Sequence, residues 1–367
     1  MITPKAKRNF IRILPFGIIW LVFSLIYTML ERGLLGHLKF YPSSHNQYIF
    51  ARNIIAIPLL ATIFGILTGI LEILYFNKWF IHNSFTKKIV YKSSIYLFII
   101  LSLLIIIFLT TANEIPTSIS HKDFWMGMWA FLIDYSFLAI LTYIACIILI
   151  AQFYTEVSES MGTSLLSNFF LGKYYKPVEE ERIFMFLDIR SSTQIAEKLG
   201  HVLYFQMLQQ YFSNLTDPVI EHSGEIYQYA GDEMILSWPL KKGLKNNACI
   251  KCFFAMKESL IVQSACYIEK YGVLPQFKAG LHCGKVTTGE IGVLKKEIIF
   301  TGDVLNATAR IEGLCNQYGV DILVSCDLLK KLDLSINYTI ESVGKNTLRG
   351  KNEQFELFTL TKKTAIS

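Results

Sequence analysis

The sequence predicts a chain in two parts, a membrane domain of four helices followed by a domain of mixed α-helix and β-sheet. The first observation is composition, because 52% of the 367 residues are hydrophobic, more than is usual for a soluble domain. The second observation is position. Long uncharged apolar runs fill residues 1–154, whereas charges, glycines and short apolar segments alternate from residue 175 onward. We therefore expect a transmembrane domain over 1–154, a helical linker over 155–177 and a globular domain over 178–367.

Four apolar runs approach the roughly 20 residues that a helix needs to cross a bilayer. They are Ile13–Leu30, Ile54–Phe76, Ile95–Thr111 and Trp129–Tyr154. The first run follows a basic cluster, as the apolar part of a signal peptide does. It is too long for a signal peptide, however, and no small-residue cleavage site follows it. We therefore expect four retained spans in the lipid bilayer.

Basic residues in the connections predict how these spans are oriented. One side carries Lys5, Lys7, Arg8, Arg12, Lys78, Lys87, Lys88 and Lys92, and the other side carries only Arg32, Lys39, Arg52 and Lys122. Connections rich in lysine and arginine stay on the cytoplasmic side. We therefore expect a multi-pass protein of the inner or plasma membrane, with a cytoplasmic N-terminus and a cytoplasmic globular domain.

Some residues in the apolar runs are not explained by membrane insertion alone. Gly65 and Gly69 form a G-x-x-x-G spacing, which serves either packing within the bundle or dimerisation. Glu72 and Asp134 are acidic residues within or near the ends of spans, where a buried charge implies a partner or a function. Asp134 could equally lie at the membrane–water interface on the outer side of the bilayer.

Charge and cysteine content argue against two classes of protein. The net charge of +6 comes from basic residues that are scattered and largely flank the apolar runs, so nucleic acid is not an expected partner. None of the seven cysteines has a histidine partner at zinc-like spacing, and we expect reduced thiols. Cys249 and Cys252 form a C-x-x-C within a helical pattern, where core packing is expected rather than redox chemistry.

The globular part alternates strand and helix patterns in a recognisable order. The predicted elements are a strand over Arg182–Ile189, helix over Gln194–His222 broken near Gly200, a hairpin of Gly224–Ala230 and Glu233–Pro239, helix over Leu244–Tyr271, strands over Gln276–His282 and Lys285–Ile291, helix over Val304–Gln317, and strands over Ile322–Ser325 and Gln354–Thr361. The order β-α-β-β-α-β is the ferredoxin-like α+β arrangement with additions. That fold alone decides no function.

Two aspartates stand where neighbouring strands end. Asp188 ends the first strand, and Asp232 lies at the tip of the hairpin. Because those strands are neighbours in this fold, the two carboxylates are expected to converge. A pair of carboxylates with little else suits Mg²⁺, which keeps waters and takes further ligands from phosphates. Either aspartate alone would be an ordinary turn residue.

Two further groups suit a phosphorylated ligand. Ser191, Ser192 and Thr193 lead into a helix N-terminus, where hydroxyls and backbone amides can bind phosphate oxygens. Asn306 and Arg310 are four residues apart and hence share one helical face. An asparagine and an arginine presented together can orient a ribose and neutralise charge on a transferring phosphoryl group.

Residues 180–362 resemble the catalytic domain of class III adenylate/guanylate cyclases. Four matching segments occur in the family's order: Phe186–Ser191, Gly231–Glu233, Gly280–Gly284 with Gly289 and Gly292, and Gly302–Glu312. The resemblance implies that two divalent metal ions, Mg²⁺ or Mn²⁺, are bound by Asp188, Asp232 and the backbone carbonyl of Ile189.

The same resemblance assigns roles to the other site residues. It implies that Asn306 orients the ribose, that Arg310 stabilises the transition state and that Lys351 binds the triphosphate, with Arg349 as a competing candidate. It also implies a head-to-tail homodimer with two equivalent sites, in which one chain supplies the aspartates and the other supplies the Asn/Arg pair. The expected reaction is attack of the ribose 3′-hydroxyl on the α-phosphate, with pyrophosphate leaving.

The positions that would read the base depart from the family pattern. Gln228 stands where adenylate cyclases usually have lysine, and Ile299 stands where they usually have aspartate or threonine. Neither is the glutamate or cysteine usual in guanylate cyclases. A glutamine amide both donates and accepts, so it can pair with either purine edge. We expect ATP as the substrate, because the glutamate that would read guanine is absent, with GTP as the alternative.

Two rival interpretations remain open at this stage. Ala230–Met234 resembles the Gly-Gly-Asp-Glu-Phe signature of diguanylate cyclases, but that family does not explain Asn306 and Arg310. The second rival is a catalytically silent receptor that uses the cyclase fold for dimerisation. The intact aspartates, asparagine and arginine favour an active, membrane-anchored adenylate cyclase that makes 3′,5′-cyclic AMP.

Overall fold

The computed structural model describes residues 3–40, 47–80, 83–112, 126, 129, 132–162, 166, 168, 171–334, 337–347 and 354–363. The chain divides into two compact units. The N-terminal unit is Ala6–Ser167, and the C-terminal unit is Asn168–Ser367 together with Met1–Lys5. The linker predicted over 155–177 stays a prediction, although α6, the last helix of the N-terminal unit, continues past Tyr154 to Met161.

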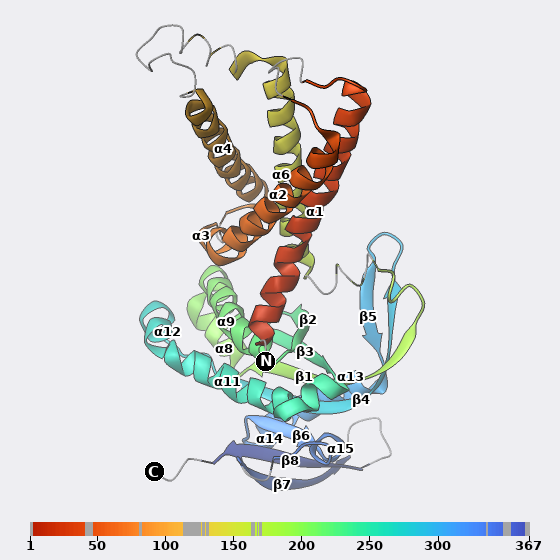
Figure 1. The fold of residues 1–367 in the computed structure, drawn as a ribbon. Helices are drawn as coiled ribbons and strands as arrows, with labels where there is room; N and C mark the ends of the chain where they lie inside the picture. Colours follow the sequence, from red (N-terminus) through yellow and green to blue (C-terminus); the bar gives the residue numbers. More distant parts are fainter. Residues whose placement is uncertain are drawn as a thin grey trace. The chain divides into compact units, whose positions relative to one another are not determined.

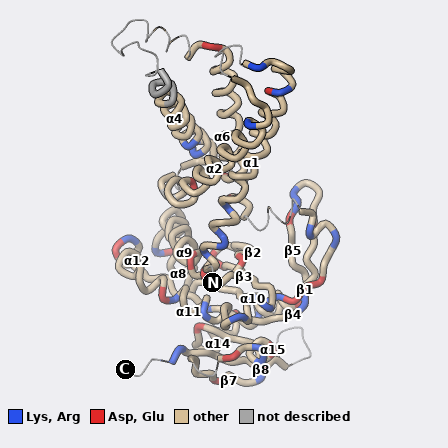
Figure 2. Tube along the Cα trace, viewed as in Figure 1, with Lys and Arg blue, Asp and Glu red and all other residues tan. Residues whose placement is uncertain are grey.

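Within the described residues of the N-terminal unit, four helices are long and apolar enough to cross a membrane, as predicted. The helices, drawn in Figure 1, are α1 (Pro4–Leu35), α2 (Phe50–Leu71) continued by the π-helix η1 (Glu72–Phe76) and the short α3 (Asn77–Trp79), α4 (Phe85–Ala112) and α6 (Tyr135–Met161). Figure 2 shows long stretches of these helices without Lys, Arg, Asp or Glu.

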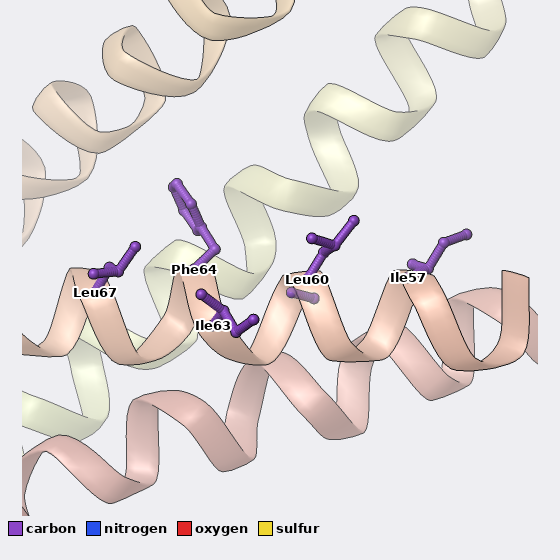
Figure 3. Close-up of a pocket in the computed structure, with 6 residues that line it drawn as sticks. Ile57, Leu60, Ile63, Phe64 and Leu67 are labelled. Carbon is purple, nitrogen blue, oxygen red and sulfur yellow. The ribbon is translucent and has the colours of Figure 1, made fainter.

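Most of the apolar surface of these helices faces away from the bundle. In each helix, no more than 28% of the most apolar window is buried. Figure 3 shows Ile57, Leu60, Phe64 and Leu67 projecting from one side of α2, where they line a shallow groove whose walls are entirely apolar. An exposed surface of this kind is unfavourable in water and suits contact with lipid chains.

The glycines of the G-x-x-x-G spacing lie at the contact between α1 and α2. A Cβ atom on Gly65 would lie 2.7 Å from Trp20, and one on Gly69 would lie 3.0 Å from Phe16. Larger residues would therefore push the two helices apart. Of the two interpretations of the spacing, packing within the bundle is the one that the structure supports.

A network of buried polar groups joins three helices of the N-terminal unit. Glu72 is fully buried, and its carboxylate accepts hydrogen bonds from Lys92 Nζ at 2.5 Å, Tyr96 Oη at 3.0 Å and Gln152 Nε2 at 3.1 Å. Lys92 Nζ also donates to Glu156 Oε1 at 2.8 Å. The network therefore ties the π-turn after α2 to α4 and α6, and the partner expected for Glu72 is present.

One assignment made from the sequence is wrong. Lys92 was counted with the basic residues of a connection, but only 1% of it is exposed, because two carboxylates offset the cost of burying its charge. Without Lys92, the basic residues on the side expected to be cytoplasmic still outnumber those on the other side.

Asp134 has a local role, because it caps the N-terminus of α6 by accepting a hydrogen bond from the backbone N–H of Ser136 at 2.8 Å.

The C-terminal unit is a mixed α+β domain around one sheet. Its strands are β1 (Val178–Ile189), β2 (Glu225–Ala230), β3 (Glu233–Pro239), β4 (Phe277–Ile291), β5 (Glu297–Thr301), β6 (Ile322–Ser325), β7 (Tyr338–Thr347) and β8 (Gln354–Lys362). Its helices are α8 (Ser192–Leu199), α9 (His201–Glu221), α10 (Leu240–Leu244), the 3₁₀ turn η2 (Lys245–Asn247), α11 (Ala248–Val262), α12 (Ser264–Tyr271), α13 (Asp303–Gly313), α14 (Cys315–Tyr318) and α15 (Cys326–Leu329).

The order of the strands confirms the ferredoxin-like arrangement. The sheet runs β2-β3-β1-β4-β6-β8-β7, with β5 paired to β4, and Figure 1 shows β1, β3 and β4 side by side. The four strands β2-β3-β1-β4 pair antiparallel throughout. α9 lies between β1 and β2 in the chain, and α11 lies between β3 and β4. This is the β-α-β-β-α-β order that the sequence predicts, extended by further strands.

Two predicted boundaries are wrong. The strands expected over Gln276–His282 and Lys285–Ile291 form a single strand, because β1 pairs with β4 continuously from Val178↔Thr288 to Ile189↔Phe277. The helix expected over Leu244–Tyr271 is interrupted at Asn246 and Asn247, which have positive φ, and again between α11 and α12. β5 and β7 were not predicted.

Both faces of β1 are covered. In β1, Ile183, Met185 and Leu187 belong to the main hydrophobic core with residues of α9 and α11, whereas Phe184 and Phe186 pack on the other face with residues that include Val304 of α13. This alternation is the period of two expected for a strand that is buried on both faces. β1 is therefore held rigidly up to its C-terminal end.

The C-x-x-C cysteines are part of the same core. Cys249 and Cys252 have free thiols and are fully buried in α11. Burial raises the pKa of both thiols, so the reactive thiolate is disfavoured. The expected core packing of these two cysteines is confirmed.

Removing the buried lysine of the N-terminal unit tests its network. Lys92→Met leaves the buried Glu72 without its cation and leaves Glu156 with only Lys88, whose Nζ lies 3.6 Å from Glu156 Oε2. We expect the free energy of unfolding to fall by about 3–5 kcal/mol. The additional change Glu72→Gln, which removes one unpaired charge, should recover part of the loss. Thermal unfolding of the full-length protein in detergent measures both effects. Lys87→Met, an exposed lysine on the same helix, is the control, and equal unfolding temperatures for the two single variants would contradict the network's role.

Candidate active site

The two aspartates predicted to converge lie at one end of the sheet. Asp188 is the penultimate residue of β1, and Asp232 lies in the turn between β2 and β3. The turn is made possible by Gly231, whose φ of 67° favours glycine. Because β3 pairs with β1 in the register Leu187↔Met234, this turn lies beside the end of β1. The predicted convergence is present in the structure.

The ionisation of Asp188 reflects this crowding. Burial is the largest effect and raises the pKa of the Asp188 carboxyl, the nearby lysine Lys278 opposes that rise, and the charge and hydrogen bond of Asp232 raise the pKa further. Because the charge and hydrogen bond of Asp232 act on the Asp188 carboxyl, the two side chains lie close enough to share a cation. Their position therefore favours binding of positive charge.

Lys278 is a site residue that the sequence analysis missed. It lies directly opposite Asp188 in the pairing of β1 with β4, and only 6% of it is exposed. Its Nζ lies 3.1 Å from Asp188 Oδ2 and 2.7 Å from Glu312 Oε1 of α13. The available signal was a lone lysine among the apolar residues of a predicted strand, but its partners depend on the register between strands.

Two glutamates add to the negative charge of the site. Burial raises the pKa of Glu233 to about 7, with smaller contributions from Glu312, Asp188 and Asp232. Burial likewise raises the pKa of Glu312, against the opposing effect of Lys278. Four carboxyl groups thus influence one another around a single buried lysine, among the residues that the structure describes. Such a cluster is stabilised by an additional cation.

The residues fit a divalent metal that takes part of its coordination from a ligand. Within the described part of the chain, no three His, Cys, Asp or Glu residues are grouped in a way that could hold a metal ion. A cation between Asp188 and Asp232 would therefore rely on backbone, water or phosphate oxygens, as Mg²⁺ commonly does. Ile189, the proposed backbone ligand, is the last residue of β1 and is 1% exposed.

The predicted phosphate-binding turn follows directly after the first aspartate. Ser191 has a φ of 55°, in the left-handed region, and turns the chain from β1 into α8. Ser192 and Thr193 form the first turn of that helix. The three residues therefore present backbone and hydroxyl groups next to Asp188 at a helix N-terminus.

The asparagine and arginine lie on α13. Asn306 is exposed and Arg310 is partly exposed, while Ile311 is fully buried, so the polar pair faces away from the core. α13 lies tightly on β4, because a Cβ atom on Gly280 would come within 2.3 Å of the backbone nitrogen of Glu312. Glycine at this position allows the helix to lie close to the sheet.

The two positions predicted to read the base lie on strands that approach each other. Gln228 is exposed on β2, and Ile299 is partly buried on β5. Their chain neighbours are in contact, since the rings of Tyr227 and Phe300 are 4.8 Å apart and the Phe300 backbone N–H donates to Tyr227 Oη at 3.3 Å. A β-bulge lies between Ile226 and Gln228. The structure therefore places Gln228 and Ile299 in the same region of the domain.

Two of the predicted phosphate ligands lie outside the described residues. Lys351 and its competitor Arg349 belong to the segment 348–353 between β7 and β8. Their assignment stays a prediction. Of the other predicted residues, the structure brings the two aspartates together and places the Asn/Arg pair on one helical face.

Comparison with known proteins identifies the domain. Residues 174–362, more than half of the chain, match the family described as the adenylate and guanylate cyclase catalytic domain. Adenylate cyclase 2 of Rhizobium meliloti is 34% identical over 209 residues, which cover 57% of this chain and 58% of that protein. Adenylate cyclase 1 of the same organism is 30% identical over 180 residues, covering 47% of this chain and 26% of that protein.

The fold has also been seen in solved structures. A bacterial light-regulated adenylyl cyclase aligns with a TM-score of 0.53 at 22% identity, covering 62% of this chain and 65% of that one, which is a similarity of fold. This chain spans 58% and 26% of the lengths of the two Rhizobium meliloti relatives. On the match over residues 174–362, the chain belongs to the adenylate and guanylate cyclase catalytic domain family.

Proposed function

We propose that the protein is a membrane-anchored adenylate cyclase that converts ATP to 3′,5′-cyclic AMP and pyrophosphate. The observation that carries the proposal is the convergence of Asp188 and Asp232 at the end of β1, within a domain of the cyclase family. The names of the relatives, all adenylate cyclases, support ATP as the substrate. A guanylate cyclase remains the alternative, because the amide of Gln228 can pair with either purine.

The chain's own groups account for each part of the reaction. Asp188, Asp232 and the carbonyl of Ile189 would hold two Mg²⁺ or Mn²⁺ ions. When bound, these ions lower the pKa of the ribose 3′-hydroxyl and offset charge on the phosphates. The 3′-oxygen forms a bond to the α-phosphorus as the bond to the β-phosphate oxygen breaks, pyrophosphate leaves with that electron pair, and the hydroxyl proton passes to solvent. Ser191, Ser192 and Thr193 bind phosphate oxygens through the start of α8.

The polar face of α13 completes the site. Asn306 orients the ribose, and Arg310 neutralises charge that develops on the α-phosphate. Lys351 or Arg349 binds the outer phosphates. α13 packs on β4 of its own sheet, and its Glu312 contacts Lys278 there. We infer that its exposed face, with Asn306 and Arg310, completes the active site formed by the aspartates of a second copy. The proposed assembly is a homodimer with two equivalent sites.

The N-terminal unit anchors this enzyme in the inner or plasma membrane. Four sufficiently long apolar helices with outward apolar surfaces support the anchor. The excess of basic residues in the N-terminal part of α1, in α3 and in the first turn of α4 supports a cytoplasmic N-terminus. With an even number of spans, the catalytic domain then lies in the cytoplasm, where ATP is available.

The first experiment identifies the product and tests the aspartates. Purified full-length protein is incubated with ATP or GTP and Mg²⁺ or Mn²⁺, and the products are identified by mass. We expect cyclic AMP, and a fall of at least about 10²- to 10³-fold in turnover for Asp188→Ala and for Asp232→Ala, because each removes charge stabilisation from the reacting centre. Asp327→Ala, an exposed aspartate on α15, is the matched control. Appreciable turnover in either site variant would remove the two-metal mechanism, and absence of any cyclic product would favour a silent receptor.

Base selection is tested at Gln228 and Ile299. Gln228→Lys supplies the usual adenine-reading lysine, and Ile299→Asp supplies its usual partner, so the double variant should raise the preference for ATP over GTP more than either single change. A contact that reads the base is worth about 1–3 kcal/mol, or roughly 10- to 200-fold in the ratio of kcat/KM values. Steady-state kinetics with both nucleotides measure this ratio. An unchanged ratio in all three variants would show that these positions do not read the base.

A further inference from the structure

The two positions predicted to read the base lie on strands that are held by different neighbours. Gln228 lies on β2, which pairs with β3, and Ile299 lies on β5, which pairs with β4. The strands β3, β1 and β4 lie between β2 and β5 in the sheet. The spacing of the two positions therefore depends on side chains that reach across the face of the sheet.

Aromatic rings make the contact between β2 and β5. The ring centroids of Tyr227 and Phe300 lie 4.8 Å apart, and Tyr227 Oη accepts a hydrogen bond from the Phe300 backbone N–H at 3.3 Å. The Phe300 ring also lies 5.5 Å from the ring of Phe184 on β1. Tyr227 directly precedes Gln228, and Phe300 directly follows Ile299. A shift in this aromatic contact therefore moves both positions.

Arg182 on β1 contacts both strands. Its guanidinium carbon lies 4.6 Å from the centroid of the Phe300 ring, and its Nη2 forms an ion pair with the carboxylate of Glu225, the first residue of β2. The same Nη2 donates to Ser237 Oγ on β3 at 2.8 Å. Only 2% of Arg182 is exposed. One buried side chain thus connects the strand that carries Gln228 with the strand that carries Ile299.

The two contacts of Arg182 use different properties of arginine. The planar guanidinium stacks on an aromatic face, while the N–H groups at its edge pair with carboxylates. Its buried charge is balanced by Glu225 and by Glu180, whose Oε1 lies 3.5 Å from Nη1. A lysine at this position would keep the charge but lacks the plane that stacks on a ring. The ion pair and the stack can therefore be separated by substitution.

We propose that Arg182 is a positioning residue for base selection, which holds β2 and β5 at the spacing where Gln228 and Ile299 contact one purine. This inference deepens the proposed function and rests on those two positions lining the site of the base. Arg182 acts through its contacts with Glu225 and Phe300. The proposed ligands of the phosphates and metal ions are other residues, so a change at Arg182 weakens the contact with the base and leaves phosphate binding intact.

The variant Arg182→Lys keeps a positive charge near Glu225 and loses the stack on Phe300. The KM for the preferred nucleotide should rise roughly tenfold, the low end of the range for one contact that selects a substrate. The kcat should be unchanged, as expected when the lost binding is common to the ground state and the transition state. The ratio of kcat/KM between ATP and GTP should move toward one. Inorganic triphosphate, which has no base, should inhibit this variant and the wild type equally.

Stability is separated from positioning by a second substitution. Arg182→Met also removes the charge, so it should unfold at a lower temperature than Arg182→Lys while losing base discrimination to the same extent. In protein that carries Gln228→Ala, Arg182→Lys should raise the KM by a smaller factor than in the wild type, because both changes act on one contact. Lys285→Met, an exposed lysine on β4, should match the wild type in every measurement.

The experiment uses full-length protein in detergent. It combines steady-state kinetics with ATP and GTP at saturating Mn²⁺, inhibition by inorganic triphosphate, and thermal unfolding. Phe300→Leu removes the ring from the same stack, should reproduce the effects of Arg182→Lys, and decides the question if that variant does not fold.

Two results would overturn the inference and leave the proposed function standing. One is a wild-type KM and a wild-type ATP/GTP ratio in Arg182→Lys. The other is a loss of inhibition by inorganic triphosphate that matches the rise in KM, which would show that Arg182 supports the whole site rather than the base contact. Wild-type protein that forms no cyclic product from either nucleotide would instead overturn the proposed function, and the role of Arg182 with it.

Discussion

The register of β1 between β3 and β4 is the constraint on which the candidate site depends. Pairing with β3 brings the turn that carries Asp232 beside Asp188, and pairing with β4 sets Lys278 opposite Asp188. Both faces of β1 are buried, so a slip of one residue would move every apolar side chain to the wrong face. The same packing that stabilises the strand therefore fixes the position of the proposed metal ligand. Gly280 allows α13 to lie close to β4, and this brings Glu312 of α13 into contact with Lys278.

Each unit of the chain contains a buried lysine that is paired with two carboxylates. In the C-terminal unit, Lys278 joins Asp188 and Glu312 at a partly open end of the sheet. In the N-terminal unit, Lys92 joins Glu72 and Glu156 in the interior of a helix bundle. A buried ion group is tolerated only where its charges are paired and hydrogen-bonded. The first group lies where additional positive charge would be stabilising. In the second group Lys88 also lies 3.6 Å from Glu156, so two lysines face two carboxylates, and the group holds three helices together.

Local patterns explain most of what the sequence predicts correctly. The four long apolar helices, the order of strands and helices around β1 to β4, and the positions of Asp188 and Asp232 at strand ends all follow from periodicity and turn residues within short windows. Asn306 and Arg310 share a helical face because four residues make about one turn. The predicted fold class is confirmed, and the two aspartates meet as expected.

The features that the sequence did not predict depend on contacts between distant segments. Lys278 is recognisable as a site residue only when its cross-strand partner is known. From the sequence alone, Lys92 is assigned to a connection, and only the positions of its two carboxylate partners show that it is buried. β4 continues through Gly284 because the full length of β1 pairs with it, whereas the local pattern suggested a break. β5 is short and flanked by Lys295 and Lys296, so its five residues give little signal on their own.

The central claim is that one active site is built from the aspartates of one chain and the asparagine and arginine of another. The most direct test mixes two inactive variants, Asp188→Ala and Arg310→Ala, by producing both in the same cells and purifying the protein. If chains pair at random, half of the dimers are mixed and each mixed dimer has one intact site, so we expect about a quarter of wild-type cyclase activity. Activity no higher than that of either variant alone would contradict the shared site and indicate that each chain forms its own.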